Sequence, residues 1–133
     1  TSVTGVQTCA LPICELQGEI YDKPGNAKTA FQQLKRLSGH THQLHTAVCL
    51  AQNNQIIWQY QDCAELTMRP LTDNEIQAYL DHDMPFFCCG SYQIESLGCH
   101  LFDQIIGSTD TIQGLPLIPL LTALRQHLAY QLG

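Results

Sequence analysis

Two β-rich segments joined by a short polar turn constrain the fold of this chain most strongly. The sequence THQLHTAVCLA at 41–51 alternates between polar and apolar residues, a pattern typical of a strand with one buried face. The residues Gln-Asn-Asn at 52–54 favour a turn, and QIIWQYQ at 55–61 predicts a second strand. We therefore expect these segments to form an antiparallel hairpin.

Shorter segments on both sides predict further strands. A short strand is expected at 19–21. A third strand at 64–70 should end at its proline, which cannot donate a hydrogen bond to a sheet. The segments 85–90, 92–98 and 101–106 are expected to be short strands or loops, because glycines separate them.

The segment AKTAFQQLKRL at 27–37 predicts a first helix. Asn26 is its expected N-cap, and Ser38-Gly39 should end it because glycine favours the position after a helix. Apolar residues at helical spacing predict its buried face: Ala27, Ala30, Phe31, Leu34 and Leu37. The polar residues are expected mostly on the side that faces water: Gln32, Gln33, Lys35 and Arg36.

Two more helices complete the expected fold. Thr72 and Glu75 have the spacing of a capping box, which begins a short helix that ends near His82. The segment at 114–132 predicts a closing helix, with two prolines in or just before its first turn. Its buried stripe should consist of Leu117, Leu120, Leu121, Leu124 and Leu128. Together the segments predict one α/β unit, a mixed twisted sheet flanked by helices.

The composition narrows the classes of function. The chain has 133 residues, which favours a single domain, and its content of 44% hydrophobic and 14% charged residues is typical of a globular protein. A net charge of −6 argues against binding to a nucleic-acid backbone. It does not argue against a nucleotide ligand, whose charge a metal ion can balance. No apolar run reaches the roughly 20 residues of a membrane span, so no membrane partner is expected.

Seven cysteines allow more than one interpretation. A disulfide framework would leave one cysteine over, and the paired C-x-x-C spacing of a zinc site is absent from the sequence. We expect reduced, buried thiols that behave as small apolar side chains, and a cytoplasmic location.

The opening stretch VTGVQTCALPI at 3–13 does not fit a folded protein of this kind. A signal peptide would need a basic start and a longer apolar stretch. A reactive Cys9 would need a neighbouring base, and none can be named. The stretch matches the conceptual translation of a common sequencing adapter, in which Cys14 would be a hybrid codon. We therefore expect residues 1–14 to be non-native and 15–133 to be the domain, whose natural N-terminal part is missing.

Local chemistry alone leaves the function open. His40 and His42 would share one face of a strand and His45 the other, with no carboxylate beside them, so a structural or surface role is favoured over a metal site. Glu95 is either an exposed strand residue or an acceptor for a base or a metal-bound phosphate. Lys23, held extended by the proline that follows it, points at a ligand or is an ordinary solvated lysine. The residues alone support an α/β domain that binds a small anionic ligand.

Four sequence blocks resemble a known family. They are GEIYDKPGN, LSGHTHQLHTAV, CCGSYQIESLG with LF shortly after it, and GLPLIPLLTAL. In their order and spacing they are similar to the Maf family of nucleoside triphosphate pyrophosphatases, over about 15–132. The resemblance implies a Maf/ITPase-like fold and hydrolysis of a nucleoside triphosphate to its monophosphate and pyrophosphate. It also implies a divalent cation, Mg²⁺ or Mn²⁺, and a homodimer as a further expectation.

The resemblance also implies substrate-binding residues. Lys23 matches the lysine of the family's KP element and would contact phosphate. Glu95 matches a position tied to base selectivity, and Tyr92 and Ser91 would shape the same pocket. The sequence GSYQIES is closer to the GSFKSEG pattern of members that prefer 7-methyl-GTP than to GAYGIQG. His40 stands where a basic residue is usual.

The catalytic residues of the family are expected elsewhere. An S-x-S-P-R-R loop that grips phosphate and a D-[TQ]-V segment with the general-base aspartate would both lie upstream of Glu15. We therefore expect no catalytic residue in this chain and negligible activity. The alternative is a non-catalytic fragment that binds a nucleotide or dimerises.

Overall fold

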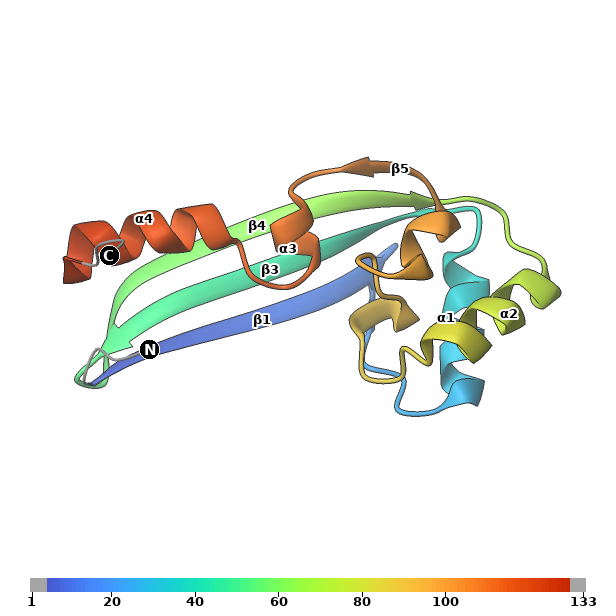
Figure 1. Ribbon diagram of the computed structural model, residues 1–133, viewed down its shortest axis with the longest axis horizontal. Helices are drawn as coiled ribbons and strands as arrows, with labels where there is room; N and C mark the ends of the chain where they lie inside the picture. The colour runs from blue at the N-terminus through green and yellow to red at the C-terminus, as the bar shows by residue number, and fades with distance from the viewer. Residues whose placement is uncertain (1–4, 130–133) are drawn as a thin grey trace.

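A computed structural model of the chain describes residues 5–129 (Figure 1). Its centre is a five-stranded sheet in the order β2-β1-β3-β4-β5, in which every pairing is antiparallel. The expected sheet with helices is confirmed, but strand directions that were expected to be mixed are antiparallel throughout the described part. The strands are β1 (Val6–Leu16), β2 (Glu19–Tyr21), β3 (Thr41–Gln52), β4 (Gln55–Met68) and β5 (Phe102–Ile106).

The helices lie at two places along the long strands (Figure 1). Two of them pack together at one end, and the other two lie against β3 and β4. They are α1 (Ala27–Leu37), α2 (Asp73–Asp83), α3 (Thr109–Ile112) and α4 (Leu117–Leu128), with two short 3-10 turns, η1 (Cys89–Ser91) and η2 (Leu97–Leu101). None of the helices in the described part of the chain is long and apolar enough to cross a membrane.

The predicted hairpin is confirmed as β3 and β4. Asn53 and Asn54 have φ of 52° and 64°, the backbone of a tight two-residue turn whose twist suits antiparallel strands. The segments 55–61 and 64–70, predicted as separate strands, instead form most of one strand. Asp62 does not break it, because Thr111 donates to the Asp62 carboxylate over 2.6 Å and satisfies it.

One face of the sheet carries the core. Residues alternate along β3 between buried and more exposed positions, and its buried side packs under the helices. The main cluster combines this face with α1 and α2, and includes Leu34, Leu37, Leu44, Leu66, Met68, Ile76 and Leu80. A smaller cluster joins Leu50 to Leu120 and Ala123 of α4. In α4 the predicted stripe is therefore wrong at Leu117, which is 43% exposed.

β1 contributes to the main core only near its end, and Val6 at its start packs against the smaller cluster. Its residues from Gln7 to Pro12 are exposed, whereas Cys14 and Leu16 are buried. The pairing with β3 nevertheless runs along nearly the whole strand. Main-chain hydrogen bonds therefore hold most of the opening segment, and the first fully buried side chain of β1 is Cys14.

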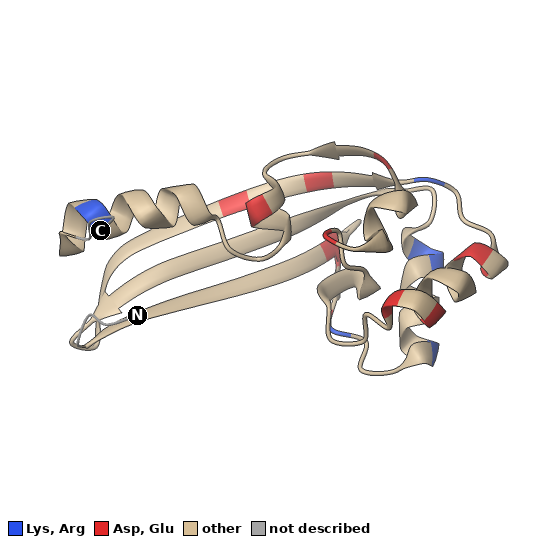
Figure 2. Cartoon of the chain, viewed as in Figure 1, with Lys and Arg blue, Asp and Glu red and all other residues tan. Residues whose placement is uncertain are grey.

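Charged side chains are unevenly distributed (Figure 2). Lys, Arg, Asp and Glu gather around α1 and α2, whereas β3 carries no formal charge (Figure 2). All seven cysteines are free thiols. Cys14 is buried and Cys9, Cys63 and Cys99 are exposed, so the expectation of buried thiols is wrong for most of them.

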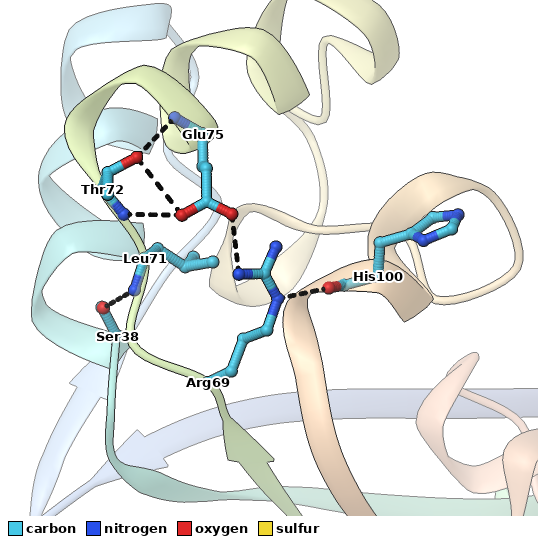
Figure 3. Close-up of polar contacts among 6 residues, drawn as sticks. All are labelled: Ser38, Arg69, Leu71, Thr72, Glu75 and His100. Carbon is cyan, nitrogen blue, oxygen red and sulfur yellow. Dashed lines mark hydrogen bonds and ion pairs between the residues drawn. The ribbon is translucent and has the colours of Figure 1, made fainter.

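A polar cluster fixes the start of α2 (Figure 3). The capping box is confirmed: Glu75 N donates to the Thr72 hydroxyl over 3.2 Å, and Thr72 N donates to Glu75 Oε1 over 3.0 Å. Arg69 pairs with Glu75 over 2.7 Å and donates to the main-chain oxygen of His100 over 2.8 Å (Figure 3). The pKa of Glu75 is lowered chiefly by the main-chain hydrogen bond from Thr72, and next by the hydrogen bond from the Arg69 side chain. The cluster therefore ties α2 to the end of β4 and to η2.

Candidate nucleotide site

Lys23 and Glu95 lie in the wall of the same cavity. Its volume is about 230 Å³. The other lining residues are Pro12, Leu44, Phe87, Cys88, Cys89, Tyr92, Ile94, Ile112, Gln113 and Gly114. Three of the four residues predicted to bind substrate thus share one hollow, although they come from distant parts of the sequence.

Loops build most of this wall. Lys23 follows β2, Phe87 follows α2, and Tyr92 and Glu95 lie between η1 and η2. Loops that a rigid sheet and helices hold in place commonly carry binding residues. Both Lys23 and Glu95 are exposed, and neither takes part in an ion pair among the described residues. Their charges are therefore available to a ligand.

The loop of Lys23 is fixed from two sides. Gly25 N donates to the main-chain oxygen of Phe86 over 2.7 Å, and the Cys89 thiol donates to the main-chain oxygen of Tyr21 over 3.5 Å. Lys23 also lines an adjoining hollow of about 560 Å³ beside β1 and β2. It consequently stands where two hollows meet.

Tyr92 closes the cavity from inside and contacts His42. The Tyr92 hydroxyl and Nε2 of His42 are 2.8 Å apart, and both side chains are buried. Burial lowers the pKa of His42 to about 4 and raises the pKa of Tyr92, so both are neutral at pH 7. The other ring nitrogen, Nδ1, is buried without a hydrogen-bond partner among the described residues. The structural role expected for this histidine agrees with its burial.

Ser91 does not line the cavity, unlike the other predicted residues. It is fully buried, and its hydroxyl donates to Oε1 of Gln33 over 2.6 Å. Gln33 Nε2 in turn donates to the main-chain oxygen of Asp22 over 2.9 Å. Ser91 is therefore connected to the Lys23 loop only through Gln33, which contacts the residue next to Lys23.

Gln33 is the residue of this network that the sequence analysis missed. It was expected to face water, but only 8% of it is exposed. The signal was present, because Ala30, Gln33, Leu34 and Leu37 follow the i, i+3, i+4, i+7 spacing of a buried helix face. A polar residue on such a face should be expected to have a buried partner.

Gly90 is required by the close packing behind the cavity. Its φ is +78°, and a Cβ there would lie 2.9 Å from the Tyr92 ring and 3.1 Å from the Cys14 sulfur. A side chain at this position would displace Tyr92 from the wall.

His40 and His45, the other histidines of the segment that contains His42, do not line the cavity. His40 is exposed, and its Nδ1 lies 2.8 Å from the main-chain oxygen of Ser38. His45 pairs with Glu15 over 2.8 Å, so the expectation that no carboxylate lies beside these histidines is wrong. Among residues 5–129 no group of three His, Cys, Asp or Glu side chains could hold a metal ion.

Few acidic groups line the two hollows. β1 contributes only apolar residues, Ala10, Leu11, Pro12 and Ile13. The carboxylates in the walls are Glu95 in the smaller hollow and Asp22 in the larger one. The residues that line the two hollows thus include one cationic side chain, Lys23, and two carboxylates, and neither carboxylate comes from a strand of the sheet.

Comparison with known proteins agrees with the sequence resemblance. The family model described as Maf-like protein matches residues 4–127. The chain belongs to the Maf family. Because this match begins inside the opening segment, the boundary between residues 1–14 and the domain at 15–133 stays a prediction.

Several curated bacterial proteins are similar to the chain. A nucleoside triphosphate pyrophosphatase of Legionella pneumophila strain Paris is 43% identical over 112 residues, which cover 84% of this chain and 56% of that protein. Proteins of the same name from Rhodopseudomonas palustris strains BisB18 and ATCC BAA-98 / CGA009 are 46% and 48% identical over 109 residues, which cover 80% of this chain and 54% of each protein. The chain therefore spans about half the length of these relatives.

Proposed function

We propose that this chain carries the nucleotide-binding wall of a nucleoside triphosphate pyrophosphatase. The whole enzyme would hydrolyse a nucleoside triphosphate to the monophosphate and pyrophosphate, by attack of water on the α-phosphorus. The observation that carries the proposal is that Lys23 and Glu95 share one cavity. The names of the Legionella and Rhodopseudomonas relatives support the same reaction.

The wall offers one group suited to the phosphates of a nucleotide and another suited to its base. The Lys23 ammonium is a compact charge that can neutralise phosphate oxygens. The Glu95 carboxylate can accept hydrogen bonds from donors on a nucleobase edge. The smaller hollow of about 230 Å³ would take the base, and the larger one of about 560 Å³ would leave room for the phosphates on the other side of Lys23.

The base is proposed to be a modified purine such as 7-methylguanine, in place of or in addition to ordinary bases. Methylation at N7 gives the base a positive charge, which a nearby carboxylate favours. Glu95 is exposed and has no ion-pair partner among the described residues, so its charge is available for this contact.

A divalent cation, Mg²⁺ or Mn²⁺, is proposed to come with the triphosphate. It would neutralise charge on the phosphates when bound. The described residues do not fit a resident metal, because they offer no group of three suitable side chains, whereas Mg²⁺ commonly takes most of its ligands from phosphate and water.

Negligible turnover is proposed for this chain by itself. A carboxylate that deprotonates the attacking water is needed; the part of β1 that borders Lys23 is apolar, and the proposal gives Asp22, the one carboxylate in the wall of the larger hollow, no role as this base. The apolar lining that β1 provides also favours the second candidate function, a fragment that binds nucleotide without catalysis. Dimer formation and a cytoplasmic location are further parts of the proposal.

The experiment measures nucleotide binding and turnover on the same protein. Titration calorimetry with 7-methyl-GTP and Mg²⁺ should show binding that Lys23→Ala weakens about tenfold, because a phosphate contact is lost. Lys28→Ala is the matched control, since Lys28 is exposed and does not line either hollow. Pyrophosphate release from a panel of nucleotides should stay at background with Mg²⁺ or Mn²⁺. Robust turnover would contradict the absence of a base, and binding unaffected by Lys23→Ala would contradict the proposed site.

A further inference from the structure

Phe87 is unusual among the apolar side chains of the described residues. It is 77% exposed, the largest value of any large apolar side chain in that range. Leaving a phenylalanine in water forgoes the favourable free energy of burying its ring. Its neighbour Phe86 packs against the main core, so the turn has an apolar anchor without Phe87.

Hydrogen bonds of the main chain hold the turn that carries Phe87. Phe87 lies in a turn in which Cys88 N donates to the main-chain oxygen of Pro85 over 3.3 Å. The same turn is tied to the Lys23 loop by the 2.7 Å hydrogen bond from Gly25 N to the Phe86 oxygen. The side chain nevertheless lines the smaller hollow together with Lys23 and Glu95. The exposed ring of Phe87 therefore borders a cavity whose wall also includes the Lys23 ammonium and the Glu95 carboxylate.

Resting on the proposed function, we infer that Phe87 is the residue on which the nucleobase stacks. An aromatic side chain can stack on the face of any base. A cationic base such as 7-methylguanine gains in addition from the negative face of the ring. Glu95 would then hold the edge of the base while Phe87 covers its face, so these residues determine together which nucleotide binds.

Binding of three probes to the whole chain tests this inference. The probes are 7-methyl-GTP, GTP and inorganic tripolyphosphate, which has the phosphates but no base. Phe87→Ala should weaken 7-methyl-GTP about tenfold, weaken GTP by a smaller factor, and leave tripolyphosphate unchanged. Phe87→Trp should keep the affinity for 7-methyl-GTP, because a larger aromatic face is restored.

Ile118→Ala is the matched control, since Ile118 is 71% exposed on α4 and does not line the cavity. It should bind all three probes like the parent chain. The inference is overturned if Phe87→Ala binds 7-methyl-GTP as tightly as the parent, or if its affinity for tripolyphosphate falls by the same factor. If the parent chain binds 7-methyl-GTP in a Lys23-dependent way while Phe87→Ala has no effect, only the stacking role fails. If the parent binds none of the probes, the proposed function fails and the stacking role with it.

Discussion

Ser91 and Gln33 are joined by a buried hydrogen bond of 2.6 Å between the Ser91 hydroxyl and Oε1 of Gln33. The amide of Gln33 continues the chain of contacts to the main-chain oxygen of Asp22, 2.9 Å away. α1 thereby holds the turn before Tyr92 and the loop of Lys23 in one arrangement. One side chain, Gln33, therefore contacts two parts of the cavity wall.

Replacing Gln33 by leucine should destabilise the protein and loosen the site. The substitution leaves the buried Ser91 hydroxyl without a partner and removes the hydrogen bond to the Asp22 carbonyl, at a cost of about 1–3 kcal/mol in the free energy of unfolding. Urea unfolding measures this cost. Gln32→Leu is the matched control, because Gln32 is the exposed neighbour on the same helix, and it should change stability by less than about 0.5 kcal/mol. Equal stability of the two variants would contradict the role of Gln33.

Acid should weaken the fold through His42. Its pKa is lowered from 6.5 to about 4 in the folded chain because the ring is buried, so the unfolded chain binds more protons between these values. The free energy of unfolding should therefore fall by about 3 kcal/mol as pH drops from 6.5 to 4. Urea unfolding of the parent and of His42→Gln at several pH values isolates this part, since carboxylates titrate in both. Identical pH profiles would show that His42 is not responsible.

The start of α2 should depend on the Thr72 hydroxyl. Thr72→Ala removes the acceptor for the main-chain N–H of Glu75 and should lower the free energy of unfolding by about 1 kcal/mol. Thr72→Ser retains a hydroxyl and should recover most of that loss. If serine and alanine destabilise the protein equally, the methyl group of Thr72 matters and the cap does not.

Much of the fold could be predicted because local patterns determine it. The α1 boundaries, the Asn53-Asn54 turn and the Thr72 capping box follow from short-range rules that the structure bears out. The long β4 could not be read from sequence, because one carboxylate oxygen of Asp62 is satisfied by a hydrogen bond from Thr111, far along the chain. Such partners depend on how the helices dock.

The site was predictable in part for the same reason. Resemblance to the Maf family selected Lys23, Tyr92 and Glu95, and these residues meet in one cavity. It also selected Ser91, which the structure places behind the wall, in contact with Gln33. Phe87 carried no sequence signal, since only its exposure beside the cavity distinguishes it from Phe86.

Nuclear magnetic resonance of the ¹⁵N-labelled chain tests most directly whether Lys23 and Glu95 belong to one nucleotide site. Titration with 7-methyl-GTP should shift the amide signals of both residues along the same saturation curve, while the signals of Lys28 and Ile118 stay in place. A shift at only one of Lys23 and Glu95, or at neither while the nucleotide binds elsewhere, would contradict the shared site.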